Sequence, residues 1–382
     1  MNKIIVGLAM FCLLAAGAGP VQAAIAKPGA SCVVAGKTAQ YQSLSLKCAK
    51  VGIKLVWKPI TASNAAVAPK EAPTPAPPEQ ALAAPATSTE EAWANSKFVK
   101  PTSANDTAKA ATAAFEDYVS STRWPNDKVA IWVEPGASST LTTWISNGAS
   151  LVAATFEKPA SIPTFNDVVA VNRDYLVDTF TKLYDSAFAS SQAGAWDSGN
   201  PAWGGRTSNA WSMSNISRYN GMVNDRVGMA QTAGHEYFHA IQENFTNVSG
   251  TSCGPCGTPQ WFWEGPAMFV GVETAAHLGY LTYAEARQTS VNRVQGQPTA
   301  KLLLSQATIN SVPAVDPYGI GELATEFLVA NVGMKKFVDV YRLKGKGLKF
   351  EVAFQIATGV PLSDFYLMFE DSRTTLGIPI AK

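Results

Sequence analysis

Hydrophobic positions divide the chain into three parts of different character. Short β-prone runs separated by Gly and Lys turns predict a small three-strand module over residues 24–60. Residues 61–96 are rich in Ala, Pro and Thr and contain almost no large apolar side chain. Such a segment cannot bury enough surface to fold, so we expect a semi-stiff linker there. The remainder, residues 97–382, predicts one larger domain.

The apolar spacing changes along this larger domain. Residues 107–124 have helical spacing, residues 128–135 form a β-rich run, and residues 164–188 are expected to move from a turn into a helix. Residues 318–372 predict a succession of helices, because apolar residues recur there three and four positions apart.

Three glycines divide that last stretch. Gly333, Gly345 and Gly359 stand where helices are expected to end. Strands early and helices late predict an α+β domain, with a mixed α/β N-terminal lobe and a helical C-terminal lobe.

Composition and charge fit this reading. The 382 residues are 47% hydrophobic and 15% charged, which is typical of a globular protein with a packed core. The formal net charge is only +1, so no nucleic-acid partner is expected.

The first 23 residues predict a signal peptide. Lys3 precedes an apolar run over residues 4–16, and small residues lie before an expected cleavage site after Ala23. An uncleaved anchor is the alternative, but the run is shorter than the roughly 20 residues that span a bilayer. We expect no stable transmembrane segment after cleavage, and a secreted or cell-envelope location.

The cysteines agree with an oxidising compartment. Cys12 should leave with the signal peptide, and the four that remain suit two disulfides between neighbours, Cys32 with Cys48 and Cys253 with Cys256. The second pair lies in "CGPC", but in a Gly, Ser and Pro loop rather than between a strand and a helix. That context argues against a thioredoxin-type motif and favours a local disulfide over free thiols.

Two histidines in "QTAGHEYFHAIQ" carry the clearest chemical signal. Residues 225–245 have helical spacing and no proline, so His235 and His239 project from one helical face, as two ligands of one tetrahedral metal ion must. Glu236 is rotated by about 100° and can reach a water molecule beside the metal. Histidines that merely pack or cap are the alternative, but they would not need the glutamate.

A catalytic zinc site normally has three protein ligands and an open position. His277 is the only other histidine, 38 positions beyond His239. Glu264 is the better candidate, because it begins an apolar helical run between aromatic residues and would be costly to bury without a cation. The alternative is a helix N-terminal charge that the macrodipole favours.

These motifs carry a family resemblance. "HEYFHAIQ" followed by "WFWEGPAMF" resembles the gluzincin metallopeptidases, in particular the peptidase MA-like group with its H-E-x-x-H and W-x-x-E-G-x-A signatures. Residues 316–370 are similar to the helical tail of that group. The resemblance implies a zincin-like, two-lobed domain that acts on a peptide or protein substrate. It also implies a Zn²⁺ ion held by His235, His239 and Glu264, with Glu236 as the general base.

Related enzymes often use a tyrosine or histidine of the C-terminal lobe to stabilise the tetrahedral intermediate, which needs a second donor besides the metal. Tyr318, in "DPYGIGE", is the leading candidate, with a packing tyrosine as the alternative. Tyr280 and His277 are weaker candidates.

Residues 208–219 alternate with period two before the metal helix. We therefore expect an edge strand there that pairs with the substrate through Trp211, Ser212 and Met213, although a surface hairpin would show the same alternation.

The small N-terminal module resembles a short Cys-containing segment, ending in "LVW", near the N-termini of secreted actinobacterial proteins. That likeness implies an accessory role at the cell envelope. The sequence thus predicts a secreted zinc-dependent peptidase. The alternatives are an inactive zinc-binding protein that kept the fold, and an adhesion or wall-associated protein that acts through the module.

Overall fold

The computed structural model separates the chain into two compact units, Met1–Pro78 and Glu79–Lys382. It describes residues 30–31, 35, 38–41, 44–51, 54–59, 84–123, 129–157, 164–198, 202–206, 210–215, 226–246, 257–296, 302–307 and 317–380. Each unit is described by itself.

The smaller unit holds a three-stranded antiparallel sheet. Its strands, in spatial order, are β1 (Thr38–Tyr41), β2 (Leu44–Val51) and β3 (Lys54–Pro59). Cys48 and Trp57 are register partners on β2 and β3, and both are buried together with Leu46. Cys48 is disulfide-bonded. Its expected partner, Cys32, lies outside the described residues, so that pairing stays a prediction.

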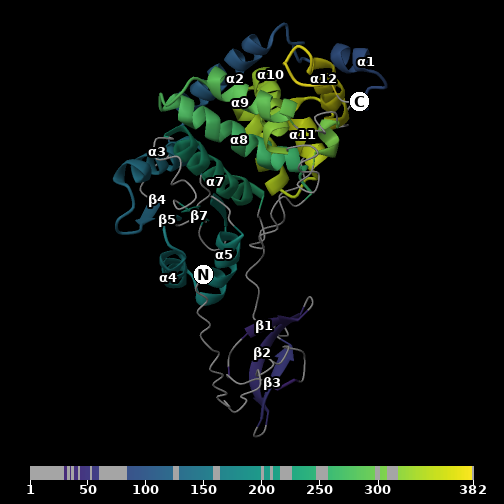
Figure 1. Cartoon of the computed structure of the whole chain (residues 1–382). Coiled ribbons are helices and arrows are strands. Elements are labelled where there is room, and N and C mark those ends of the chain that lie inside the picture. Colours follow the sequence, from purple (N-terminus) through teal and green to yellow (C-terminus); the bar gives the residue numbers. More distant parts are fainter. Residues whose placement is uncertain are drawn as a thin grey trace, which may run out of the picture. The chain divides into compact units, whose positions relative to one another are not determined.

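The larger unit follows the predicted order, with strands early and helices late (Figure 1). Its elements are α1 (Thr89–Asn95), α2 (Ala104–Ser121), β4 (Val129–Val133), α3 (Ser139–Thr155), β5 (Phe165–Ala170), α4 (Arg173–Leu183), α5 (Ser186–Asp197), β6 (Ala202–Arg206), β7 (Ala210–Asn215), α7 (Arg226–Thr246), α8 (Gln260–His277), α9 (Tyr283–Gly296), η1 (Leu304–Gln306), α10 (Pro317–Gly345), α11 (Phe350–Thr358) and α12 (Leu362–Ser372). The expected α+β class is confirmed.

A four-stranded sheet forms the first part of this unit, in the order β4-β5-β7-β6. The strands β4, β5 and β7 are parallel, and β6 joins β7 antiparallel. Helices cover both faces. On β5, Val168 and Ala170 pack with residues of α4 and α5, whereas Phe165 and Val169 belong to the main core with α3 and α7 (Figure 1).

The expectation of a turn at the start of residues 164–188 was wrong, since β5 lies there. The polar residues that suggested a turn are used inside the sheet. The side-chain oxygen of Asn166 accepts a hydrogen bond from Trp132 (3.1 Å), and its amide donates to the Tyr184 hydroxyl (3.2 Å). A strand that is buried on both faces also loses the apolar–polar alternation that identifies strands in sequence.

The expectation that residues 208–219 supply a sheet edge was also wrong. Trp211, Ser212 and Met213 lie on β7, which pairs with β5 on one side and with β6 on the other. The two edge strands of the described sheet are β4 and β6. The sequence of β6, AWGGR, has two glycines and therefore little intrinsic preference for a strand.

The expected linker, residues 61–96, extended too far. Within it, α1 packs against the C-terminal helix α12. Ala92 is fully buried, and the Trp93 indole donates a hydrogen bond to Asp371 (2.9 Å). The Ala86 amide donates to Asp364 (3.0 Å). The larger unit therefore begins before residue 97.

The three predicted helix-ending glycines behave differently. Gly359 caps α11 in the left-handed conformation (φ 81°), and Gly345 is the last residue of α10. Gly333, at φ 76° and ψ 162°, separates two helices within α10, as expected, in a region that glycine alone adopts readily.

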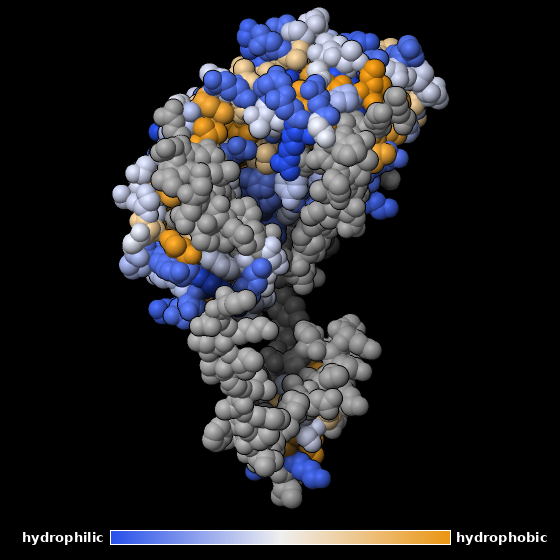
Figure 2. Space-filling view, in the orientation of Figure 1, coloured by the Kyte–Doolittle hydropathy of each residue, from blue (hydrophilic) through white to orange (hydrophobic). Residues whose placement is uncertain are grey.

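The visible surface of the larger unit is mostly hydrophilic where it is coloured, with hydrophobic residues in separate small groups (Figure 2). Among the described helices none alone is long and apolar enough to cross a membrane, while α11 and α12, bent by 69°, meet the criterion of length and composition as a pair.

Candidate metal centre

The candidate metal centre depends on a close crossing of α7 and α8. A Cβ on Gly271 of α8 would lie 2.5 Å from the carbonyl oxygen of Gln231 on α7, and a Cβ on Gly234 would lie 3.3 Å from the Gly271 Cα. Only glycines allow the backbones to approach this closely. The crossing brings one face of α7 against the middle of α8.

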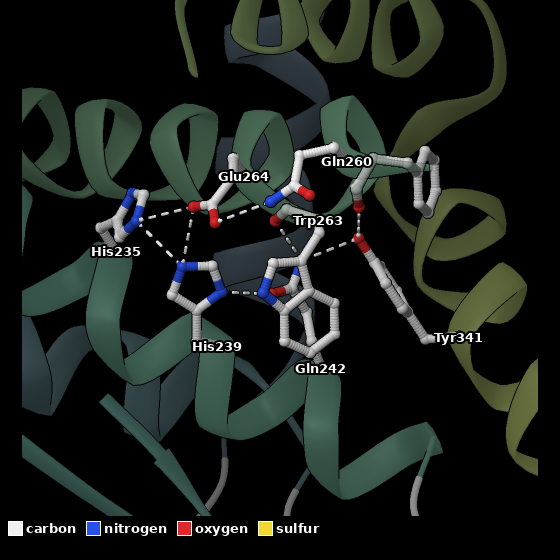
Figure 3. A network of polar contacts seen from close by, with 8 residues as sticks. His235, His239, Gln242, Gln260, Trp263, Glu264 and Tyr341 are labelled. Carbon is white, nitrogen blue, oxygen red and sulfur yellow. Dashed lines mark hydrogen bonds and ion pairs between the residues drawn. The ribbon is translucent and has the colours of Figure 1, made fainter. Parts of the chain in front are cut away.

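Three predicted ligands meet at this crossing, His235 and His239 from α7 and Glu264 from α8 (Figure 3). The two histidine Nε2 atoms are 3.0 Å apart. The Glu264 Oε2 lies 3.2 Å from the His239 Nε2 and 3.6 Å from the His235 Nε2. All three residues are about 7% exposed. One atom from each residue lies within 4.8 Å of the others, which fits a single metal ion.

Without a metal ion, Glu264 and His239 shift each other's pKa values. Burial disfavours a charged His239, but the neighbouring Glu264 carboxylate outweighs burial and raises the pKa of His239 to about 9. Burial alone would raise the pKa of Glu264, yet the charge of His239 and hydrogen bonds from both histidines hold it well below its usual range. Glu264 is therefore ionised in a buried site, where a positive partner is required.

Glu236 lies next to this group without belonging to it. It is 8% exposed, and burial raises its pKa against the opposing charges of His235 and His239. The backbone amide of Gly204, on the edge strand β6, donates a hydrogen bond to its carboxylate. Strand β6 thus contacts the site directly through Gly204.

Aromatic rings flank the two histidines. The Trp263 ring stacks on His239, with centroids 5.4 Å apart and planes 17° apart. Tyr318, at the start of α10, stacks on His235 at 6.0 Å and 25°. The Arg293 guanidinium lies over the Tyr318 ring, 5.5 Å from its centroid. Tyr318 is half-buried, so its ring lies at the boundary of the site.

His277 and Tyr280, the weaker candidates for the oxyanion donor, contact residues outside the candidate metal centre. His277, at the end of α8, has its Nδ1 2.9 Å from the Glu116 carboxylate. The Tyr280 hydroxyl accepts a hydrogen bond from the Asn147 amide (2.8 Å). Neither residue belongs to the group that could hold a metal ion.

Sequence reasoning missed Gln242, which contacts His239 through a 2.7 Å hydrogen bond. A signal was present, because residues three apart share a helical face. It also missed Gly204, whose role depends on a long-range approach of strand and helix. Cys253 and Cys256 lie outside the described residues, so their predicted disulfide is not tested.

Comparison with protein families, with curated proteins and with solved structures finds no match to this chain. Two imidazoles and one carboxylate, buried and converging, can hold a metal ion, and an adjacent carboxylate with a raised pKa can exchange a proton.

Proposed function

We propose that this protein is a zinc-dependent peptidase of the gluzincin type, with a zincin-like larger domain. The observation that carries the proposal is the convergence of His235, His239 and Glu264, with Glu236 beside them. An N₂O donor set of three protein ligands suits zinc with one position left for substrate or water. A purely structural zinc site has four protein ligands and no use for an adjacent base.

In this proposal, a bound zinc ion supplies Lewis-acid polarisation of the scissile carbonyl and activation of a water molecule. Glu236 accepts the proton of the attacking water and delivers it to the nitrogen of the leaving amine. Burial raises the pKa of Glu236, which makes it a stronger base than an exposed glutamate and supports this role.

Two further groups would serve the substrate. The β6 edge offers backbone groups to an extended peptide, and its Gly204 lies against Glu236. Tyr318 is the proposed hydrogen-bond donor to the tetrahedral oxyanion, which its stacking on His235 supports. We further propose export to the outside of the cell, on the strength of residues 1–23, and envelope contact through the small module.

The deciding experiment compares the native protein with Glu236→Gln, measuring zinc per chain and turnover of casein or a peptide library. We expect one zinc in each and a loss of turnover of about 10²–10⁴-fold in the variant. Glu243→Gln, which removes another buried carboxylate of α7, is the matched control and should keep its turnover.

Equal zinc content without turnover in any protein would favour an inactive zinc-binding protein. Absence of zinc from the native protein would refute the metal centre itself. Equal turnover of native and Glu236→Gln would refute the assignment of the base.

A further inference from the structure

A continuous chain of hydrogen bonds links His239 to the backbone of α8 (Figure 3). The Nδ1 of His239 lies 2.7 Å from the side-chain oxygen of Gln242. The Gln242 amide nitrogen donates to the Trp263 carbonyl (2.8 Å) and to the Tyr341 hydroxyl (3.0 Å). The Tyr341 hydroxyl donates to the Phe262 carbonyl (2.9 Å). Gln242 and Tyr341 are both fully buried, so this chain is shielded from water.

The direction of every bond follows from the two ends of the chain, because backbone carbonyls only accept hydrogen bonds. The Tyr341 proton points to Phe262, so the Tyr341 oxygen accepts from Gln242. The second amide proton of Gln242 points to Trp263. A flipped Gln242 amide would place its oxygen against the Trp263 carbonyl, with two acceptors facing each other. The Gln242 oxygen therefore faces His239, and the Nδ1 of His239 carries a proton.

We propose that Gln242 is a positioning residue of the metal centre, which holds His239 as the tautomer that binds metal through Nε2. With the proton on Nδ1, the Nε2 lone pair is directed toward His235 and Glu264. Partners of this kind fix ring orientation and ligand basicity at metal sites. The inference rests on the proposed zinc centre and adds the device that orients one of its ligands.

The two histidine ligands are held unequally. Among the described residues the buried Nδ1 of His235 has no hydrogen-bond partner, whereas the Nδ1 of His239 has Gln242. The Trp263 ring also stacks on His239, so packing and hydrogen bonding fix that ring together. His239 is thus oriented by a hydrogen bond and by a stacked ring, and His235 by the stacked Tyr318 ring.

The test measures zinc affinity by competition with a chelator in the full secreted chain, together with the melting temperature of each metal-free protein. We expect Gln242→Leu to remain folded and to bind zinc about 10–100-fold more weakly than the native protein. Tyr341→Phe should weaken zinc binding by a smaller factor, since Gln242 keeps its bond to Trp263.

Tyr366→Phe is the matched control. The Tyr366 hydroxyl accepts a hydrogen bond from Trp261 of α8 (3.0 Å), and this bond lies outside the Gln242 chain. The control should keep native zinc affinity. A second readout is the Nδ1 proton of His239 in the zinc-loaded protein, observed by ¹⁵N-edited NMR. It should exchange slowly with solvent in the native protein and rapidly in Gln242→Leu.

The outcomes separate this inference from the proposed function. Native zinc affinity in a folded Gln242→Leu would overturn the positioning role and leave the peptidase proposal standing. Weakened binding in Gln242→Leu, with no turnover in any protein, would support the positioning role and refute the peptidase. A native protein without zinc would overturn both. If Gln242→Leu does not fold, equal affinities of Tyr341→Phe and Tyr366→Phe would overturn the inference.

Discussion

The buried Glu322 should make the free energy of unfolding depend on pH. It lies fully buried on α10, where Ser290 donates a 2.5 Å hydrogen bond to its carboxyl group. Burial raises the pKa of Glu322 to about 8, from an ordinary value of 4.5. The folded protein therefore holds this proton more tightly than the unfolded chain does. The resulting stability is complete below about pH 4.5 and is lost as the pH rises through 8.

The size of the effect follows from the two pKa values. Their difference corresponds to about 5 kcal/mol in the free energy of unfolding, of which about 3 kcal/mol is already lost at pH 7. Glu322→Gln cannot ionise, and its carbonyl can still accept the Ser290 hydrogen bond. The variant should match the native protein near pH 4.5 and become more stable than it, by these amounts, as the pH increases.

Urea unfolding of metal-free protein at several pH values between 4.5 and 8 tests this prediction. Glu285→Gln is the control, because hydrogen bonds from Thr282 lower the pKa of Glu285 instead of raising it. Its difference from the native protein cannot grow in the same direction. Parallel curves for native and Glu322→Gln across this range would refute the reasoning.

Two further predictions concern helix packing. Gly271→Ala should weaken zinc binding and lower the melting temperature, because its Cβ would meet the Gln231 carbonyl oxygen at 2.5 Å. Gly296→Ala is the control, since a Cβ there would have nothing within 4 Å. Equal zinc affinity of the two variants would contradict the prediction. Trp93→Ala should lower the free energy of unfolding in urea by about 1–3 kcal/mol, because it removes a bond to Asp371 and part of the α1 packing. Native stability of that variant would contradict the stabilising role of the Trp93 contacts.

The candidate metal ligands could be predicted because their signal is local. Two histidines four positions apart share a helical face in any helix, whatever surrounds it. Glu264 was found through its apolar neighbours, which make an unpaired carboxylate costly. Gln242 has the same local relation to His239, but its role depends on Tyr341, 99 positions later.

The sheet and the domain boundary could not be predicted in the same way. Strand order depends on pairing between distant segments, and neither the glycines of β6 nor the polar residues of β5 reveal it. The helix α1 is short, and its sequence resembles the linker before it. Its stability comes from α12, at the other end of the chain. Helices with strong apolar periodicity were predicted well, because apolar residues three and four positions apart define the buried face within a few turns.

The two parts of α10, before and after Gly333, contact different residues of the candidate metal centre. Before the break, Tyr318 stacks on His235. After it, Tyr341 contacts Gln242, which holds His239. Residues on either side of Gly333 thus contact one candidate ligand directly and the other through Gln242. A change in the angle between the two parts of α10 at Gly333 would therefore alter the surroundings of both histidines.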